Sequence, residues 1–449
     1  MKKLLVVLLS LGLIVAFSTA ASAADVKFSG QYYVGGVYES NPMLTPDDVA
    51  DGRSHYSHAF FYTRTRFQPV FQIAEGLTFT ARIDALEKQW GQTNWKGGYS
   101  DEPLSRKLTA VTADPPRGMQ ENIEFERGYV TFTTAIGGFQ VGYQAADEWG
   151  TAFGDNGTTR PRILYQLPVG PMTIVAIYEK FYETATAFGV NLRKTDADYD
   201  TYALAGVYKF KGGEAGLLGK YYNDASQRDA TLGSYRTKIY LISPYAKATF
   251  GPVYFEAEFD YVGGKAAAFD VAGTDIDMQA WGAYVMAKVN LGPAYVGGLF
   301  AYATGDDGTD ATKITTFPAG GGTSWNPALI LMNDDMNTWS GGGATTSPAG
   351  VTSKKLNMML AQVFGGFNVT PKLNLGAALT WAKANEKLTF VDDKLGTEID
   401  VTATFKIYDN LSYMMGAGYL FTGDYFKGAS AANEIGNDYL LMNKLTLSF

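Results

Sequence analysis

The sequence predicts an all-β protein, a transmembrane antiparallel up-and-down β-barrel of about 18 strands, with 16 as the alternative count. Three observations support this prediction: the alternation at the carboxyl end, the order of short turns and long loops, and strands with one charged and one apolar face. Near the carboxyl end, the apolar Leu441, Leu445 and Leu447 alternate with Lys444 and Thr446. A period of two is typical of a β-strand with one face toward an apolar medium.

Short turns and longer polar connections follow one another in strict alternation along the chain. Gly, Pro, Asn and Asp mark eight short turns, near 74–76, 136–138, 170–171, 211–213, 251–252, 292–293, 370–371 and 409–410. Nine longer connections lie near 41–56, 91–120, 150–160, 184–198, 224–234, 264–275, 304–353, 386–396 and 423–437. Together these connections join eighteen strands. An even number of strands places both termini beside the short turns, which in an outer-membrane barrel are periplasmic, and makes the long loops extracellular.

Several strands carry their charges on one face only, as residues 77–85, 253–261 and 398–407 show. Because a basic side chain that faces lipid costs about 2–4 kcal/mol near the bilayer midplane, we expect the charged face to line a wet lumen. The predicted pore-lining residues are Tyr62, Arg64, Arg66, Arg82, Asp84, Glu256, Glu258, Asp260, Glu398, Asp400, Lys406 and Lys444. The alternation slips in residues 122–134, where we expect a bulge near Gly128, and in residues 172–181, so the faces of these two segments are not assigned.

The pore-lining candidates divide by charge. Arg64, Arg66 and Arg82 form a basic tract in the amino-terminal third, and Arg127 and Arg162 are outlying candidates for it. The carboxylates of 256–260 and 398–400 form acidic strands that we expect on the opposite wall. Rows of opposite charge that face each other across a pore orient polar solutes. The alternative is that these charges only solvate the lumen or pair with one another.

The amino-terminal end predicts export. Lys2 and Lys3 precede an uncharged apolar run at 4–17, and the small residues Ala21-Ser22-Ala23 follow it. We therefore expect a signal peptide at 1–23 that is cleaved during export by the Sec route, and a single barrel domain at 24–449. An uncleaved anchor is the alternative, but the apolar run is shorter than the ~20 residues that a spanning helix needs.

Composition excludes several classes of protein. The chain has no Cys, so neither disulfides nor Cys-ligated clusters are expected. The chain has 45 acidic and 37 basic residues, and this acidic excess argues against a nucleic-acid partner. The mean hydropathy of −0.09 argues against a helical membrane protein, whereas a barrel meets lipid with only every second residue of each strand. A soluble all-β secreted protein is the competing class.

Two segments resemble a known family. Residues 125–132 read F-E-R-G-Y-V-T-F and residues 138–144 read G-F-Q-V-G-Y-Q. This pair resembles two strands of the alginate-export and related substrate-specific porins, although Tyr143 stands where that family usually has Arg. Residues 302–307 resemble the family's strand-to-loop G-D-x stretch. The resemblance implies an eighteen-stranded channel but not alginate as its cargo. The terminal Phe449 resembles the last residue of outer-membrane barrels, which the barrel assembly machinery reads as an assembly signal.

The connection 304–353 is the longest in the chain and far exceeds the usual loop length. Its middle contains Trp325, Leu329, Ile330 and Trp339, which make it too apolar to lie in water. We expect this loop to fold into the pore as a constriction or plug. The alternatives are a lid over the pore and a contact with a partner at the cell surface.

These observations together predict a Gram-negative outer-membrane porin, a water-filled channel for passive diffusion of small hydrophilic solutes or ions. The alternative is a barrel that serves as a sleeve or anchor for a partner protein. The expected surroundings and partners are outer-membrane lipid, lipopolysaccharide, the barrel assembly machinery and small polar solutes, and the expected assembly is a homotrimer or a monomer. No catalytic residue, metal or cofactor is expected, because His55 and His58 are the only histidines and have no convincing further ligands.

Overall fold

The computed structural model describes residues 25–42, 44, 46, 57–91, 123–155, 157–183, 197–228, 234–270, 273–318, 325–333, 336, 339, 356–387 and 389–449. The predicted signal peptide at 1–23 and His55 lie outside these residues, so both remain predictions. Among the described residues, no helix has the length and apolar character needed to cross a membrane.

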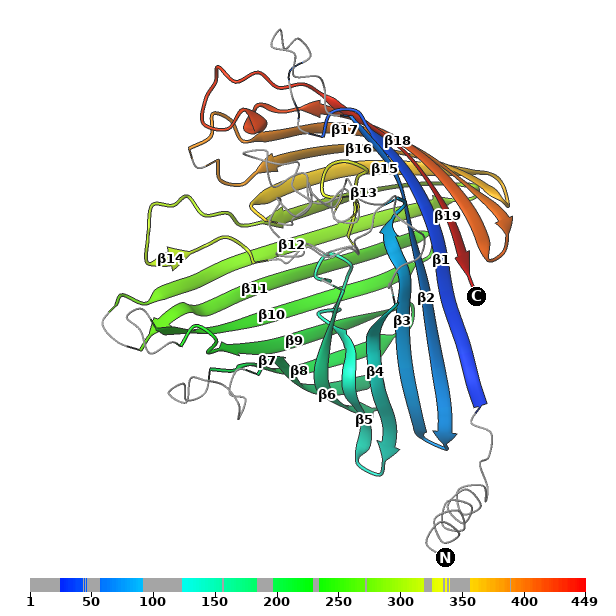
Figure 1. Cartoon of the computed structure of the whole chain (residues 1–449), viewed down its shortest axis with the longest axis vertical. Helices are drawn as coiled ribbons and strands as arrows, with labels where there is room; N and C mark the ends of the chain where they lie inside the picture. Colours follow the sequence, from blue (N-terminus) through cyan, green and yellow to red (C-terminus); the bar gives the residue numbers. More distant parts are fainter. Residues whose placement is uncertain are drawn as a thin grey trace, which may run out of the picture.

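The described residues form one closed antiparallel barrel of eighteen strands, as the sequence predicts (Figure 1). The wall strands are β1 (Asp25–Glu39), β2 (His58–Ala74), β3 (Leu77–Gln89), β4 (Ile123–Thr134), β5 (Gly137–Ala146), β6 (Thr158–Val169), β7 (Met172–Tyr182), β8 (Tyr199–Phe210), β9 (Gly213–Asp224), β10 (Tyr235–Phe250), β11 (Val253–Phe269), β12 (Ile276–Leu291), β13 (Ala294–Ala303), β15 (Met358–Thr370), β16 (Leu373–Ala384), β17 (Lys394–Tyr408), β18 (Leu411–Thr422) and β19 (Asp438–Ser448). The short β14 (Lys313–Ile314) belongs to the long loop and pairs in parallel with β12.

The barrel closes between its first and last strands. β1 and β19 lie side by side, drawn in blue and red in Figure 1, and pair in an antiparallel register from Gln31 with Ser448 to Glu39 with Leu440. Phe449 extends this pairing, because its backbone exchanges hydrogen bonds of 2.8 and 3.0 Å with Gly30. Closure satisfies the backbone groups of both edge strands, which a lipid environment requires.

Every predicted short turn joins two neighbouring strands of the barrel. In the turns at Gly251-Pro252 and Gly292-Pro293, the glycines have φ values of 59° and 65°. Glycine adopts this left-handed region without steric cost, and the proline that follows is fixed near a φ of about −65°. These turns are therefore set by local sequence alone.

One predicted loop is wrong in its extent. The connection expected at 264–275 begins later, because β11 continues to Phe269. Gly264 has a φ of 120° inside the strand, and the pairing of β10 with β11 shifts register nearby, between Arg236 and Lys238. The glycines at this position therefore bend a continuing strand and do not begin a loop.

Apolar side chains cover the outer face of the wall, as the alternation predicts. Leu204 and Val363 are each 62 % exposed, and Ile399 and Val401 alternate along β17 with the buried Glu398 and Asp400. A belt of exposed aliphatic and aromatic side chains is unfavourable in water and suits contact with lipid. The outer face thus favours a membrane barrel over the soluble all-β protein.

A bulge explains the first of the two segments whose faces the sequence does not reveal. The register of β3 with β4 shifts at Glu126, two residues before Gly128, so that Arg127 lies opposite Arg82 while Phe125 lies opposite Ile83. In β7 the shift lies at Phe181, between Lys180 and Tyr182, and so at the end of the unassigned segment. The apolar Ile177 shares the inner face with Glu179 there, so apolar side chains occur on both faces of this strand. Each extra residue turns the following side chains to the other face of the wall, which removes the simple alternation.

Candidate functional site

The interior of the barrel is divided into an apolar half and a charged half. Buried apolar side chains of β11–β13, β15–β19 and β1–β2 form one cluster, and this cluster includes loop residues from Trp325 to Met332 together with Trp339. The middle of the long loop therefore lies inside the barrel against one side of the wall. The remaining inner surface, from β2 to β11, carries a series of ion pairs.

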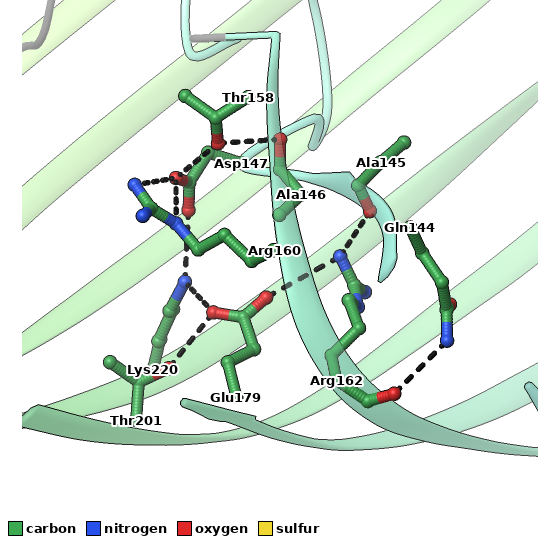
Figure 2. A network of polar contacts seen from close by, with 10 residues as sticks. All are labelled: Gln144, Ala145, Ala146, Asp147, Thr158, Arg160, Arg162, Glu179, Thr201 and Lys220. Atoms are coloured by element: carbon green, nitrogen blue, oxygen red, sulfur yellow. Dashed lines mark hydrogen bonds and ion pairs between the residues drawn. The ribbon is translucent and has the colours of Figure 1, made fainter. Parts of the chain in front are cut away.

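A network of five charged residues lies at the centre of the charged half (Figure 2). Lys220 on β9 donates to Glu179 on β7 at 2.6 Å and to Asp147 at 2.9 Å. Arg160 on β6 binds Asp147 at 3.1 Å, and Arg162 lies 3.4 Å from Glu179. Each carboxylate thus lies between two cations, and strands β6, β7 and β9 are tied together across the lumen surface.

Hydroxyl and carbonyl groups complete this network. Thr201 donates to Glu179 at 2.8 Å and Thr158 donates to Asp147 at 2.9 Å. Arg162 donates to the carbonyl of Ala145 at 2.5 Å, which fixes its guanidinium beside β5 (Figure 2). A buried charge is tolerated only when its hydrogen-bonding capacity is used in this way.

Asp147 lies in the connection after β5, outside the strands. Burial would raise the pKa of its carboxyl group, but Lys220 and Arg160 outweigh this effect and hold the pKa below its ordinary value. Because the folded-state pKa is lowered, the stabilisation from Asp147 is complete above the ordinary pKa of an aspartate and is lost as the pH falls through the lowered value.

A cavity of 360 Å³ borders the network, and both aromatic rings and carboxylates line it. The Arg160 guanidinium lies 3.4 Å from the centre of the Phe181 ring, and that ring stacks on Tyr199 at 4.2 Å. Glu258 and Asp260 of β11 line the cavity as well. Charged groups of both signs beside flat apolar surfaces suit a small polar organic solute.

The predicted basic tract lies on β2 and β3, but its charges are paired on its own wall. Arg66 binds Asp84 through two hydrogen bonds of 2.7 and 2.5 Å, and Arg82 lies 3.6 Å from the same carboxylate. Arg64 lies 3.5 Å from Glu87. These ion pairs favour the alternative in which the charges pair with one another over rows of opposite charge that face each other across the pore. A bulge at Leu86, which has a φ of 55°, places Glu87 opposite Arg64.

The two predicted acidic segments, 256–260 on β11 and 398–400 on β17, place their carboxylates inside the barrel, where loop segments and hydroxyl groups contact them. Glu256 accepts hydrogen bonds from Tyr254 and Tyr284 at 2.7 and 2.8 Å. Glu258 binds the connection between β5 and β6, and Glu398 binds the long loop. Asp260 and Asp400 are each 4 % exposed. The sequence predicts their strands and faces but not the loops that cover them.

The remaining candidates surround Tyr33 or lie at the strand ends. Tyr62 stacks on Trp339 with ring centres 4.6 Å apart, and Lys444 lies 4.3 Å from the centre of the Tyr33 ring. Lys406 is exposed near the end of β17. Tyr62, Trp339 and Lys444 thus lie together inside the barrel, whereas Lys406 lies apart from them.

The sequence prediction omits the residues of the central network. Arg162 is expected there only as an outlying member of the basic tract, and Asp147, Arg160, Glu179 and Lys220 are not predicted. The Arg160-Pro161-Arg162 spacing places two basic side chains on one face of a strand and is a usable signal. No local signal pairs Lys220 with Glu179, because they meet through the neighbouring strands β7, β8 and β9.

Replacing Asp84 with asparagine tests the pairing on β2 and β3. Asp84 is 1 % exposed, so the change leaves Arg66 and Arg82 with less compensation, at a cost of about 1–3 kcal/mol in unfolding free energy. The lumen also becomes more positive, and we expect the reversal potential in a salt gradient to move toward anions. Glu75→Gln, in the exposed turn between the same strands, is the control with equal charge change. Equal shifts in both variants would contradict a lumenal role for Asp84.

No protein-family model matches the chain, and no curated protein sequence matches it. Solved structures do resemble it. OccK8 (OprE) of Pseudomonas aeruginosa superposes with a TM-score of 0.52 at 12 % identity, over 95 % of this chain and 98 % of that one. OccK2 (OpdF) of the same organism, in complex with glucuronate, gives 0.51 at 11 % identity over 95 % and 98 %.

OpdK of Pseudomonas aeruginosa, solved with vanillate, gives a TM-score of 0.51 at 10 % identity, over 94 % of this chain and 99 % of that one. The fold is that of bacterial outer-membrane porins. Identities this low establish the shared barrel architecture, and the side chains of the lumen must be argued from this chain alone.

Proposed function

We propose that this protein is an outer-membrane porin, a passive channel for small hydrophilic solutes. The observation that carries this proposal is the division of the lumen, in which the protein's own loop fills the apolar half while a cavity remains beside the charged half. A closed barrel with an apolar outer face and charged inner wall is the architecture of a water-filled pore.

The solute is small and polar. The neighbouring structures that hold glucuronate and vanillate each contain a small organic carboxylate. In this chain the cavity brings together Arg160, Arg162 and Lys220 with carboxylates and aromatic rings, which suits charged organic molecules and inorganic ions. The chain's own loop packs inside the barrel against one side of the wall, which argues against the sleeve or anchor function.

We also infer how the protein is exported, what surrounds it and how it is assembled. Residues 1–23 direct export by the Sec route and are removed, outer-membrane lipid and lipopolysaccharide surround the barrel, and Phe449 is read by the barrel assembly machinery. We infer transport without catalysis. His58, the first residue of β2, binds Glu39 at 2.8 Å and is not among the residues that line the cavity.

Recordings from purified protein in a planar bilayer test the function directly. We expect stepwise increases in conductance, with an ion preference that changes when charges of the central network are removed. Outer-membrane vesicles that contain the protein should also take up small sugars faster than vesicles without it. A folded barrel that is electrically silent and impermeable would contradict the channel function, and co-purification of a stoichiometric protein partner would favour the sleeve.

A further inference from the structure

We propose that Glu258 and Glu398 are positioning residues that hold two inward loop segments together as one constriction. The two segments are residues 147–155, which follow β5, and residues 325–333 of the long loop. The inference rests on the proposed channel function, since it names the groups that set the width of that channel.

Glu398 holds the long loop through its backbone. Its carboxylate accepts hydrogen bonds from three consecutive N–H groups, those of Leu329 and Ile330 to one oxygen at 2.9 and 2.7 Å and that of Leu331 to the other at 2.7 Å. Glu398 is fully buried on the inner face of β17. Successive N–H groups that converge on one anion form a concave binding site, so the loop is wrapped around this side chain.

The wall beside Glu398 is shaped to receive the loop. A Cβ atom at Gly418, on the adjacent β18, would lie 3.3 Å from the Leu329 Cβ and 3.3 Å from a Glu398 carboxylate oxygen. Gln362 on β15 donates to the carbonyl of Pro327 at 2.5 Å and so binds the loop from a second strand. The contact with Glu398 is therefore part of an extended seat for the loop.

Glu258 holds the other segment in a similar manner. One of its carboxylate oxygens accepts the Thr151 N–H at 2.5 Å and the Thr151 hydroxyl at 2.6 Å. Gly150 and Gly154 allow this approach, since a Cβ atom at Gly154 would lie 1.9 Å from the second oxygen of Glu258. A side chain at position 154 would displace the carboxylate. The segment is therefore built around Glu258.

The two segments meet through aromatic rings. Phe153 stacks on Tyr284 of β12, with ring centres 5.5 Å apart, and meets the Trp325 ring edge-on at 5.4 Å. Both Phe153 and Trp325 are buried. Each carboxylate thus anchors one side of a single aromatic contact, and a loop released from one wall would loosen the other.

Neither anchor forms an ion pair in the part of the chain that the structure describes. The partners of each buried carboxyl group are loop N–H and hydroxyl groups, and a buried polar group without such partners is unfavourable. A side chain at either position that cannot accept these hydrogen bonds therefore removes the contact that holds the segment.

The absence of cysteine from the chain allows a direct test. Ile330 is buried, so an Ile330→Cys reporter should react slowly with a water-soluble maleimide. Adding Glu398→Ala should accelerate labelling about tenfold or more, the effect of losing one hydrogen bond to a charged group. Adding Glu258→Ala should accelerate labelling of the same reporter, because the loops are coupled. The release of a neutral trisaccharide from liposomes should rise in both variants.

Asp84→Ala is the control, because Asp84 is a buried carboxylate of the inner wall that binds Arg66, with no loop N–H among its bonds in the described structure. In this variant the Ile330→Cys reporter should react with the maleimide as slowly as it does in the parent protein. Equal labelling in Glu398→Ala and the parent would overturn the anchor, and faster labelling in Glu398→Ala but not in Glu258→Ala would overturn the coupling.

Heat-modifiable electrophoresis checks that each variant is folded. If Glu398→Ala does not fold, Glu398→Gln takes its place, because its amide oxygen still accepts from Leu329 and Ile330 but its amide nitrogen cannot accept from Leu331. Faster labelling in Glu398→Gln supports the anchor, and unchanged labelling overturns it. Labelling does not depend on conduction, so a silent barrel with faster labelling would contradict the channel function while retaining the anchor.

Discussion

Replacing Lys220 with methionine is expected to destabilise the barrel by about 3–5 kcal/mol and to shift its ion preference toward cations. Lys220 is 7 % exposed and binds both Glu179 and Asp147, of which Glu179 is 2 % exposed. Its loss leaves two buried carboxylates with one cation fewer. Removal of a partner from a buried ion pair is costly because the remaining charge has lost its solvation and receives nothing in exchange.

Urea titration of the folded band in heat-modifiable electrophoresis measures the stability of this variant, and reversal potentials in a salt gradient measure its ion preference. Lys265→Met is the control of equal charge. Lys265 lies on β11 and binds Asp277 at 2.6 Å, but it is 42 % exposed, and exposed ion pairs contribute little. If Lys220→Met and Lys265→Met were equally stable, Lys220 would not be the centre of the lumenal network.

Deletion of Phe449 is expected to lower the amount of barrel in the outer membrane several-fold. The residue contributes in two ways: its backbone exchanges two hydrogen bonds with Gly30, and its ring packs over that glycine and near Phe67, with ring centres 6.2 Å apart. Without it the seam between β1 and β19 ends early and leaves backbone groups of β1 unpaired.

Phe449→Ala separates the two contributions, because it keeps the backbone bonds and removes only the ring. Gly30→Ala gives a complementary change, since a Cβ atom there would lie 2.5 Å from the Phe449 ring and 2.6 Å from the Arg66 carbonyl. Immunoblots of outer-membrane fractions measure all three variants. Unchanged levels of the truncated protein would show that the closing residue is dispensable for assembly.

The position of the long loop 304–353 is not determined by its own sequence. The apolar character of Trp325, Leu329 and Ile330 predicts that they avoid water, yet a lid, a partner contact and an inward fold satisfy that condition equally. The inward position depends on Glu398, a strand residue far along the chain whose carboxylate binds this segment. Such a contact has no sequence signature, because loop closure over this distance is decided by the whole barrel.

The charges of the lumen show the same limit. The period of two predicts that Arg66, Arg82 and Asp84 share one face, because side-chain direction is a local property of a strand. It does not predict that Arg66 binds Asp84 or that Lys220 reaches Glu179, since those contacts depend on the register between strands. A single bulged residue, as at Glu126, changes the face of every residue beyond it.

The sequence by itself determined the eighteen strands, their tight turns and the apolar outer face. These features follow from turn residues and alternation, which act within a few residues. The tertiary structure alone decided which half of the lumen the loop fills, which charges neutralise one another, and which carboxylates hold the inward segments. Those outcomes require groups from distant strands to meet, and only the closed barrel brings them together.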